Sequence, residues 1–324
     1  MASQGGNGST SKPQGFGGQP QLQAFANPLM SDFVSDWSPM HDAAVNGRLL
    51  SLRMLISQVG NHFTFLFGIE AFVKLSSFED EPAFPVPTGY GVNLVTADRV
   101  SPLHEACLAG HSTCAGVLLK HGAQVDGMTV DWHTPLYNAC VSGSQDCVNL
   151  LLEHGASPHP TCELASPIHE AAKRGHLECV ESLVSHGANI NENIRHLGTP
   201  LYVACENQQI DCAKRLLESG ANANQGKELD SPLHVAARNS SSDLVHLLID
   251  FGAEPHSKNA EGKRPVDLVP PNSTLAQVFS QKEGPLSLMQ ICRLRIRKCF
   301  GIKQHHRISE LLLPEELKRF LLHI

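Results

Sequence analysis

Apolar residues in the middle of the chain recur in short helical stretches that come in pairs. In LHEACLAG and STCAGVLLK the apolar positions follow the three- and four-residue spacing of one helix face, and Gly110-His111 separates the two stretches. A Ser or Thr followed by Pro opens each first stretch, as an N-cap and first-turn pair would. A Gly suited to a left-handed C-cap closes each second stretch. The pattern predicts two helices and a turn.

This paired pattern repeats along most of the chain. The opening tetrapeptides are SPMH, SPLH, TPLY, SPIH, TPLY and SPLH, followed by a degenerate RPVD, and their prolines stand at positions 39, 102, 135, 167, 200, 232 and 265. After the first interval, every step is 32 or 33 residues. Because one helix pair cannot bury its apolar face alone, successive pairs are expected to stack into a solenoid.

The first interval is longer than the others by 30 residues, and the surplus corresponds to Val59–Thr88. This atypical insertion at 59–88 contains six of the thirteen phenylalanines and none of the repeat signature. It follows a helix end, where extra loop length costs little conformational entropy. Three interpretations remain open: an additional binding loop, a lineage-specific or splice-dependent insert, or translated intron sequence in a gene model.

Composition and charge narrow the class of protein. The 324 residues are 41% hydrophobic and carry a net charge of −7, but residues 285–324 carry +5 and the rest −12. An acidic body argues against nucleic-acid binding, which depends on neutralising phosphates. No apolar run reaches the roughly 18 residues of a membrane helix, and no secretory leader is recognisable. Residues 1–30, rich in Gly, Gln and Ser, are expected to be disordered.

Several histidines and cysteines could suggest a metal or catalytic site, but most of them are explained by their positions in the repeat. His41, His104, His169 and His234 share one repeat position with Tyr137 and Tyr202, which a metal or catalytic role would not accept. The cysteines at 114, 147, 179 and 212 share another position and are interpreted as small buried residues. The spacing of Cys292, Cys299, His305 and His306 does not match a structural zinc site. We find no catalytic motif and expect no cofactor. Ten cysteines without a C-x2-C pair indicate reduced thiols in the cytoplasm.

The repeat resembles the ankyrin repeat. The family phrases TPLHxA and LLxxGAxxN correspond to Ser101–Ala106 and to a phrase beginning at Leu118. The resemblance implies an ankyrin array over residues 31–281, with six repeats and a partial capping repeat that starts near Glu261. In ankyrin repeats the shared histidine braces the loops between repeats, so the same role is expected here.

The tail has a different pattern. If SLMQICRLRI is helical, Leu288, Ile291, Cys292 and Ile296 share one stripe. The stripe resembles the elongin-binding part of a SOCS box, in which Leu288 and Cys292 would enter a pocket of elongin C beside Ile296. Leu313 and Pro314 resemble part of its cullin-contacting segment, although Leu312 replaces the first proline. An amphipathic helix folded onto its own repeats is the alternative.

The order of parts resembles the ankyrin repeat and SOCS box family. The resemblance implies an all-α fold, an ankyrin solenoid followed by a C-terminal three-helix SOCS box at 285–324. It also implies a non-catalytic substrate-recognition subunit of a ubiquitin ligase, which binds elongin C with elongin B and a cullin-5 type scaffold with its RING protein. A non-degradative ankyrin scaffold or inhibitor is the alternative function.

The sequence does not identify the protein substrate, but it suggests where one would bind. Ankyrin arrays bind partners through their hairpin tips and the exposed face of their first helices, where exposed aromatic and basic residues are the best candidates. These candidates are Phe33, Trp37, Asp98, Arg99, Trp132, His133, Tyr137, Lys173, Arg174 and Tyr202.

Overall fold

The computed structural model describes residues 37–57, 91–159, 165–282 and 312–322, together with Leu288, Ile291, Cys292, Arg295 and Ile296. All of them belong to one compact unit, Asp36–Ile324. The segment expected at 1–30, the candidate Phe33 and the insertion at 59–88 lie outside the described residues.

The described residues form helix pairs, as the repeat pattern predicts. The first helices are α1 (Pro39–Val45), α4 (Pro102–Leu108), α6 (Pro135–Ser142), α8 (Pro167–Arg174), α10 (Pro200–Glu206) and α12 (Pro232–Arg238). The second helices are α2 (Leu49–Ser57), α5 (Ser112–Lys120), α7 (Gln145–Glu153), α9 (Leu177–Ser185), α11 (Ile210–Glu218) and α13 (Ser242–Asp250). A 3-10 helix η3 (Pro265–Leu268) and α14 (Thr274–Lys282) follow, and α16 (Glu315–Leu322) lies in the tail.

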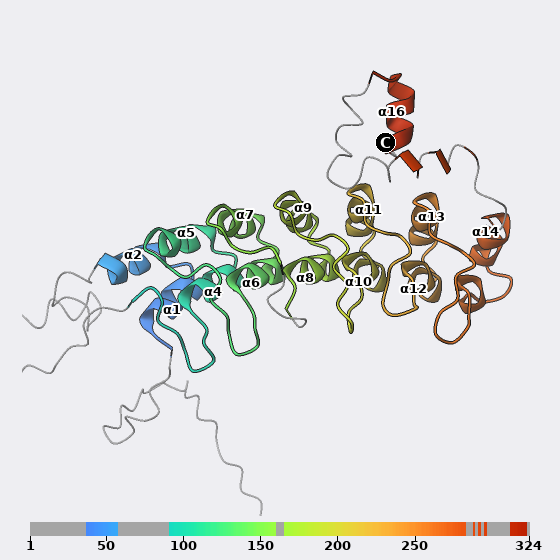
Figure 1. The fold of residues 1–324 in the computed structure, drawn as a ribbon. Helices are drawn as coiled ribbons and strands as arrows, with labels where there is room; N and C mark the ends of the chain where they lie inside the picture. Colours follow the sequence, from blue (N-terminus) through green and yellow to red (C-terminus); the bar gives the residue numbers. More distant parts are fainter. Residues whose placement is uncertain are drawn as a thin grey trace, which may run out of the picture. The chain divides into compact units, whose positions relative to one another are not determined.

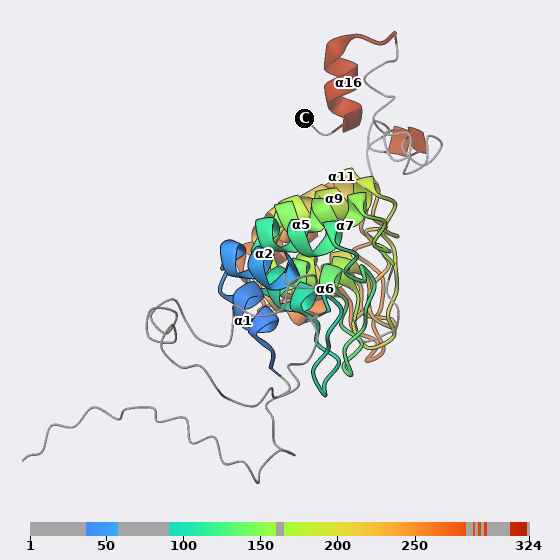
Figure 2. The same ribbon diagram turned by 90° about the vertical axis from the view of Figure 1, so that its left-hand side faces the viewer.

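The helix pairs of the array stack in two rows. Each first helix packs against the first helix of the next pair, from α1 to α12 and then η3, and the second helices from α2 to α13 pack in the same order. The hairpin loops before the first helices project away from the second-helix row (Figures 1 and 2). The described chain contains helices and isolated bridges, such as Ile194 with Gly198, but no extended strand. The predicted all-α solenoid is confirmed.

The predicted caps are present at the helix ends. The hydroxyl groups of Ser38, Thr134 and Thr199 accept hydrogen bonds from the backbone N–H three residues later, and Pro occupies the first turn. The glycines that close the second helices adopt the left-handed conformation, with φ of 85° at Gly122 and 91° at Gly187. Side chains with a Cβ adopt this conformation at a cost, so glycine fixes where each helix ends.

The shared histidines brace consecutive repeats, as expected from the ankyrin resemblance. Each Nε2 atom donates a hydrogen bond to a carbonyl oxygen of the next hairpin: His41 to Val100 at 2.9 Å, His104 to Gly127 and His133 at 3.1 Å each, His169 to Gly198 at 3.0 Å and His234 to Lys263 at 3.1 Å. Each Nδ1 atom lies 2.7–2.8 Å from the hydroxyl of the Ser that caps the same helix. Both ring nitrogens are therefore occupied.

Burial lowers the pKa of three of these imidazole rings, those of His41, His104 and His169, and favours their neutral form. It lowers the pKa of His104 and of His169 from 6.5 to about 4, although their backbone hydrogen bonds act in the opposite direction. The pKa of His41 is lowered for the same main reason. A neutral ring with one donor and one acceptor matches the serine and carbonyl partners of His41, His104 and His169. His234 has the same two kinds of partner, so the shared histidines have a structural role.

The core contains a column of reduced cysteines. Cys114, Cys147, Cys179 and Cys212 are buried on the second helices, as predicted, and Cys107, Cys140 and Cys205 are buried on first helices. Burial is the main cause that raises the pKa of Cys205 and of Cys212 to about 12. These thiols pack between repeats as small apolar side chains.

Candidate partner-binding surfaces

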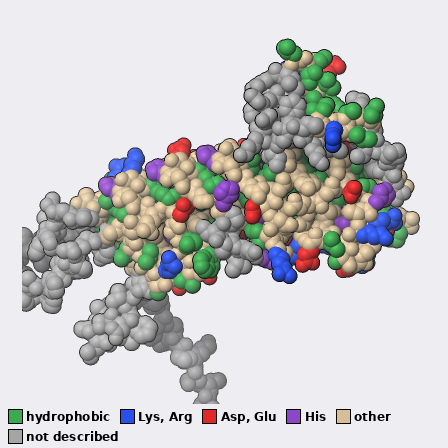
Figure 3. All heavy atoms as spheres, in the orientation of Figure 1, with side chains coloured by type: hydrophobic (Ala, Val, Ile, Leu, Met, Phe, Trp, Pro, Cys, Tyr) green, Lys and Arg blue, Asp and Glu red, His purple; other side chains and the backbone are tan. Residues whose placement is uncertain are grey.

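Two neighbouring hairpins form an exposed ridge at their tips. We define the tip ridge as Asp98, Arg99, Val130 and Trp132, all of which are exposed. The two hairpins are joined by a hydrogen bond of 3.0 Å from the Val130 N–H to the Asp98 carbonyl. Trp132 has 49% of its surface exposed, and Figure 3 shows hydrophobic side chains at the surface over the hairpin end of the first repeats. The ridge combines a large aromatic ring with a cation.

Backbone conformation at the ridge is unfavourable for its residues. Arg99 and Trp132 have φ of 60° and 64°. Gly262 occupies the same place in a later hairpin, two residues before the capping position, and has φ of 74°. The left-handed conformation costs a residue with a Cβ roughly 1–2 kcal/mol, and glycine avoids this cost. A large aromatic residue at a position suited to glycine makes the fold less stable. This favours a role for Trp132 other than stabilising the fold.

Behind the ridge, two further candidates form an aromatic stack. The rings of His133 and Tyr137 lie 4.3 Å apart and within 15° of parallel. The Tyr137 hydroxyl donates to Glu170 at 3.4 Å, and Arg174 pairs with the same carboxylate. Burial and the charge of Glu170 raise the pKa of Tyr137 to about 12, so the hydroxyl stays protonated. Lys173 and Arg174 are exposed beside this cluster.

The structure contradicts the prediction that the ring of Tyr202 is exposed. Only 3% of its surface is exposed. The hairpins close over the ring: a Cβ added at Gly226 would lie 2.9 Å from it, and one at Gly198 would lie 3.0 Å from it. Glycine at these positions permits a close approach that larger residues would block. The ring of Tyr202 is therefore part of the core.

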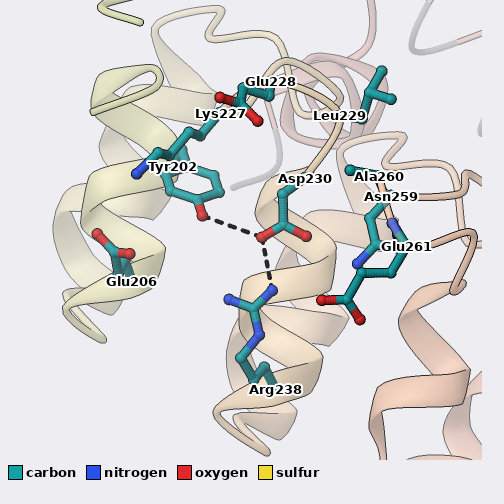
Figure 4. Close-up of a pocket in the computed structure, with 10 residues that line it drawn as sticks. All are labelled: Tyr202, Glu206, Lys227, Glu228, Leu229, Asp230, Arg238, Asn259, Ala260 and Glu261. Carbon is teal, nitrogen blue, oxygen red and sulfur yellow. Dashed lines mark hydrogen bonds and ion pairs between the residues drawn. The ribbon is translucent and has the colours of Figure 1, made fainter. Parts of the chain in front are cut away.

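The hydroxyl of Tyr202 belongs to a charged network that the sequence analysis did not identify. It donates to the Asp230 carboxylate at 3.1 Å, and Arg238 pairs with the same oxygen at 2.8 Å (Figure 4). Burial and then the Asp230 charge raise the pKa of Tyr202 to about 12. A signal was present, because both TPLY repeats replace histidine with a ring whose hydroxyl needs a partner, but the partner Asp230 lies just outside the repeated tetrapeptide.

Trp37 lies at the start of the described array. Trp37 has 42% of its surface exposed, and its ring lies 5.4 Å from the ring of His41. This contact supports a capping role for Trp37, and the exposed part of the residue is open to a partner.

The described part of the tail presents an apolar stripe. Leu288, Ile291, Cys292 and Ile296 are helical, the first three are exposed and Ile296 is half-buried. Leu288 has 76% of its surface exposed. Leu312 and Pro314 are exposed, and Leu313 is half-buried before α16. Cys299, His305 and His306 lie outside the described residues. Exposed apolar residues at helical spacing are typical of a partner-binding surface.

None of the described helices is long and apolar enough to cross a membrane. The ankyrin array is similar to a solved ankyrin repeat structure. The crystal structure of the human ASB11 ankyrin repeat domain is 48% identical, covers 78% of this chain and 100% of that chain, and superposes with a TM-score of 0.65.

Matches to family models and to relatives cover both the ankyrin array and the tail. The model for ankyrin repeats (3 copies) matches residues 83–162 and 168–259, and the SOCS box model matches residues 284–322. Ankyrin repeat and SOCS box protein 9 of Mus musculus is 65% identical over 308 residues, covering 95% of this chain and 96% of that protein. The protein of the same name from Homo sapiens is 60% identical over 314 residues, covering 97% of each. The chain therefore belongs to the ankyrin repeat and SOCS box family.

Proposed function

We propose that the chain is a substrate-recognition subunit of a cullin-RING ubiquitin ligase. The ankyrin array, residues 31–281, binds a target protein and directs its ubiquitination and degradation. The SOCS box, residues 285–324, binds elongin C with elongin B and a cullin-5 type scaffold with its RING protein. The chain contributes no catalytic group: it holds a target lysine near the charged conjugating enzyme, which replaces a bimolecular encounter with a nearly unimolecular one.

The observation that carries this proposal is the exposed stripe inside the region matched by the SOCS box model. Leu288 and Cys292 lie one helical turn apart on the stripe, and both are exposed. We assign them to the elongin C pocket, with Ile296 beside them. An apolar stripe of this kind is unfavourable in water and favours a permanent partner.

The cullin contact is assigned to Leu313 and Pro314. The Pro314 carbonyl accepts hydrogen bonds from the N–H groups of Leu317 and Lys318, at 3.0 and 3.1 Å, and thereby starts α16. The segment is thus fixed at the start of a helix, with Pro314 exposed. Leu312, which replaces a proline of the family pattern, is also exposed, and we expect its greater backbone freedom to weaken this contact.

The target protein is assigned to the hairpin side of the array. The tip ridge offers Arg99 and the exposed indole of Trp132, and Lys173 adds a cation from the end of α8. Aromatic and arginine side chains contribute strongly to binding when a partner covers them. The buried free thiols support action in the cytoplasm, where cysteines stay reduced.

Co-expression with elongin B and C tests the proposal. We compare the unchanged chain with a Leu288→Ala, Cys292→Ala double variant and measure elongin capture by pull-down. Since truncating a central interface residue costs about 2 kcal/mol or more, we expect the double variant to lose more than about 90% of the captured elongin.

The matched control is a Leu50→Ala, Met54→Ala double variant. It also removes two exposed apolar side chains one turn apart, but on α2 of the array. Capture by the control should equal that of the unchanged chain. Equal capture by both double variants, or no capture by any chain, would contradict the proposal and leave a non-degradative ankyrin scaffold.

A further inference from the structure

Two buried cysteines face each other across the boundary between the second and third helix pairs. Cys107 lies in the last turn of α4, and Cys147 lies in the first turn of α7. Both residues have 0% of their surface exposed. The helix α4 packs against α6, and α6 forms a helix pair with α7 (Figure 1). The two sulfur atoms therefore belong to different repeats.

Contacts of two serines hold the end of α4 against the start of α7. The hydroxyl of Ser142 donates a hydrogen bond to the Cys107 carbonyl at 2.8 Å. The Cys147 N–H donates to the Ser144 hydroxyl at 3.4 Å. Gly110, three residues after Cys107, approaches the same serine, because a Cβ added at Gly110 would lie 3.6 Å from the Ser144 Cβ. Each cysteine is thus fixed beside the turn that joins α6 to α7.

The two thiols are in direct contact. The Cys107 thiol donates a hydrogen bond to the sulfur of Cys147. This bond is the main cause that lowers the pKa of Cys147, and the same bond, followed by burial, raises the pKa of Cys107. The thiolate is the reactive form of cysteine, and the first turn of a helix favours a negative charge. Cys147 is therefore suited to be the nucleophile and Cys107 to be the resolving thiol.

The next boundary between repeats holds a matched pair of cysteines. Cys107 and Cys140 lie five residues after the opening proline of their repeats, and Cys147 and Cys179 lie twelve residues after it. Cys140 and Cys179 thus occupy the same two positions one repeat later, and both are buried. In the described part of the chain, a hydrogen bond between two thiols joins only Cys107 and Cys147. The second pair therefore shares the burial but lacks the thiol contact.

We propose that Cys107 and Cys147 form a modification site, at which hydrogen peroxide converts the two thiols to a disulfide. The Cys147 thiolate attacks one oxygen of the peroxide and breaks the O–O bond, which gives a sulfenic acid and hydroxide. The Cys107 thiolate then attacks the Cys147 sulfur, the S–S bond forms and a second hydroxide leaves. The protons of the two thiols convert both hydroxides to water, and two electrons pass from the sulfur atoms to the peroxide.

The disulfide would link the two repeats whose hairpins carry the tip ridge. The hairpin with Arg99 leads into α4, and the hairpin with Trp132 leads into α6. Because both thiols are buried, peroxide reaches them only when the boundary between the repeats opens locally. The exposed Cys292 should therefore be oxidised faster and provides an internal reference. The proposal does not depend on the ligase role.

The test treats the full, reduced chain with hydrogen peroxide at neutral pH without denaturant. Samples taken over time are blocked with N-ethylmaleimide in urea, digested and analysed by mass spectrometry. We expect a peptide pair joined through Cys107 and Cys147, two hydrogen atoms lighter than the separate peptides, which dithiothreitol separates. In a mixture of 14N- and 15N-labelled chains, both peptides of the pair should carry the same label, because the link forms within one chain.

Two variants at the same repeat position provide the matched comparison. Cys147→Ala should abolish the linked pair and leave Cys107 reduced, whereas Cys179→Ala should form the pair at the rate of the unchanged chain. Both variants remove a buried thiol from a second helix, so urea unfolding should verify that both stay folded. In the unchanged chain, we expect a link between Cys140 and Cys179 in less than about a tenth of the yield, because these thiols are not in contact.

Three results would overturn the proposal. The first is the absence of the linked pair from the folded chain after Cys292 has been fully oxidised. The second is an equal yield of the two possible links, which would indicate that burial in the core and not the thiol contact selects the site. The third is a linked pair that forms only at urea concentrations that unfold the chain, because the disulfide would then belong to the unfolded state.

Discussion

The repeats that carry histidine after the Ser-Pro cap and those that carry tyrosine after Thr-Pro use the same position in different ways. The histidine rings are buried and bond to the capping serine and to a backbone carbonyl of the next hairpin. The tyrosine hydroxyls extend further and donate to a carboxylate, Glu170 or Asp230, which also pairs with an arginine. One position thus links repeats either through neutral backbone contacts or through charged side chains.

The capping residue changes together with the ring. Ser231 places its hydroxyl 2.7 Å from the Nδ1 atom of His234. Thr199, which precedes a tyrosine, instead donates its hydroxyl to the Gln225 carbonyl at 2.9 Å. A tyrosine ring offers no acceptor near the cap, so the threonine hydroxyl bonds to the hairpin directly. Both kinds of position connect one repeat to the next. The two kinds of link differ in their charge and in their access to partners.

The largest expected effect is a dependence of the free energy of unfolding on pH, which differs between the histidine repeats and the tyrosine repeats. The unfolded histidine has a pKa near 6.5, and folding lowers that of His104 and His169 to about 4. The unfolded chain therefore binds more protons, and the free energy of unfolding falls as pH decreases from 6.5 toward 4. A shift of this size corresponds to about 3 kcal/mol for each histidine. Urea unfolding across this range measures it.

The tyrosine repeats should respond at the opposite end of the pH scale. Folding raises the pKa of Tyr137 and Tyr202 from 10 to about 12, so the stabilisation is complete below pH 10 and is lost as pH rises through 12. Stability that stays constant between pH 6.5 and 4.5 would contradict the account of the histidines.

The next effect comes from removing one neutral link. His169→Ala should lower the free energy of unfolding by about 3 kcal/mol, because it leaves a cavity and removes the donor to the Gly198 carbonyl. The measurement is urea unfolding at pH 7.5. Replacing the exposed His159 by Ala is the control and should change stability by less than about 0.5 kcal/mol. A similar loss in both variants would show that burial of the ring is not the cause.

The smallest effect concerns the charged link. Tyr202→Phe removes only the hydroxyl that donates to Asp230, which keeps its pair with Arg238, so we expect a loss of about 1 kcal/mol. Tyr137→Phe should cost less, because its hydrogen bond to Glu170 is longer, 3.4 Å against 3.1 Å. Urea unfolding ranks the two variants, and the reverse order would contradict the assigned geometry.

Much of the fold could be predicted from the residues at the helix ends. Ser or Thr before Pro marks the start of each first helix, and a glycine such as Gly122 marks the end of a second helix, because these residues meet the same backbone requirement in each repeat. The histidine links were expected from the resemblance to ankyrin repeats. Their partners, such as the Gly198 carbonyl, lie about 30 residues away and became visible only in the structure.

The candidate surfaces were harder to predict from sequence. The repeat position of Tyr202 suggested an exposed ring, but exposure depends on how closely the hairpins pass over it, which Gly198 and Gly226 decide. The strained backbone of Trp132 has no sequence signature apart from the missing glycine. In the tail, spacing placed Leu288 and Cys292 on one stripe, and both are helical and exposed, whereas their binding to elongin stays a prediction.

The buried cysteines make it possible to measure local opening of the array at each repeat that contains one. Seven described thiols lie in the core of four consecutive repeats, and Cys292 lies exposed in the tail. A thiol reagent would modify Cys292 at once and each core cysteine only when its repeat opens, so the order of labelling would give the opening free energy of each repeat. The chain thus allows its stability to be mapped repeat by repeat without an added probe.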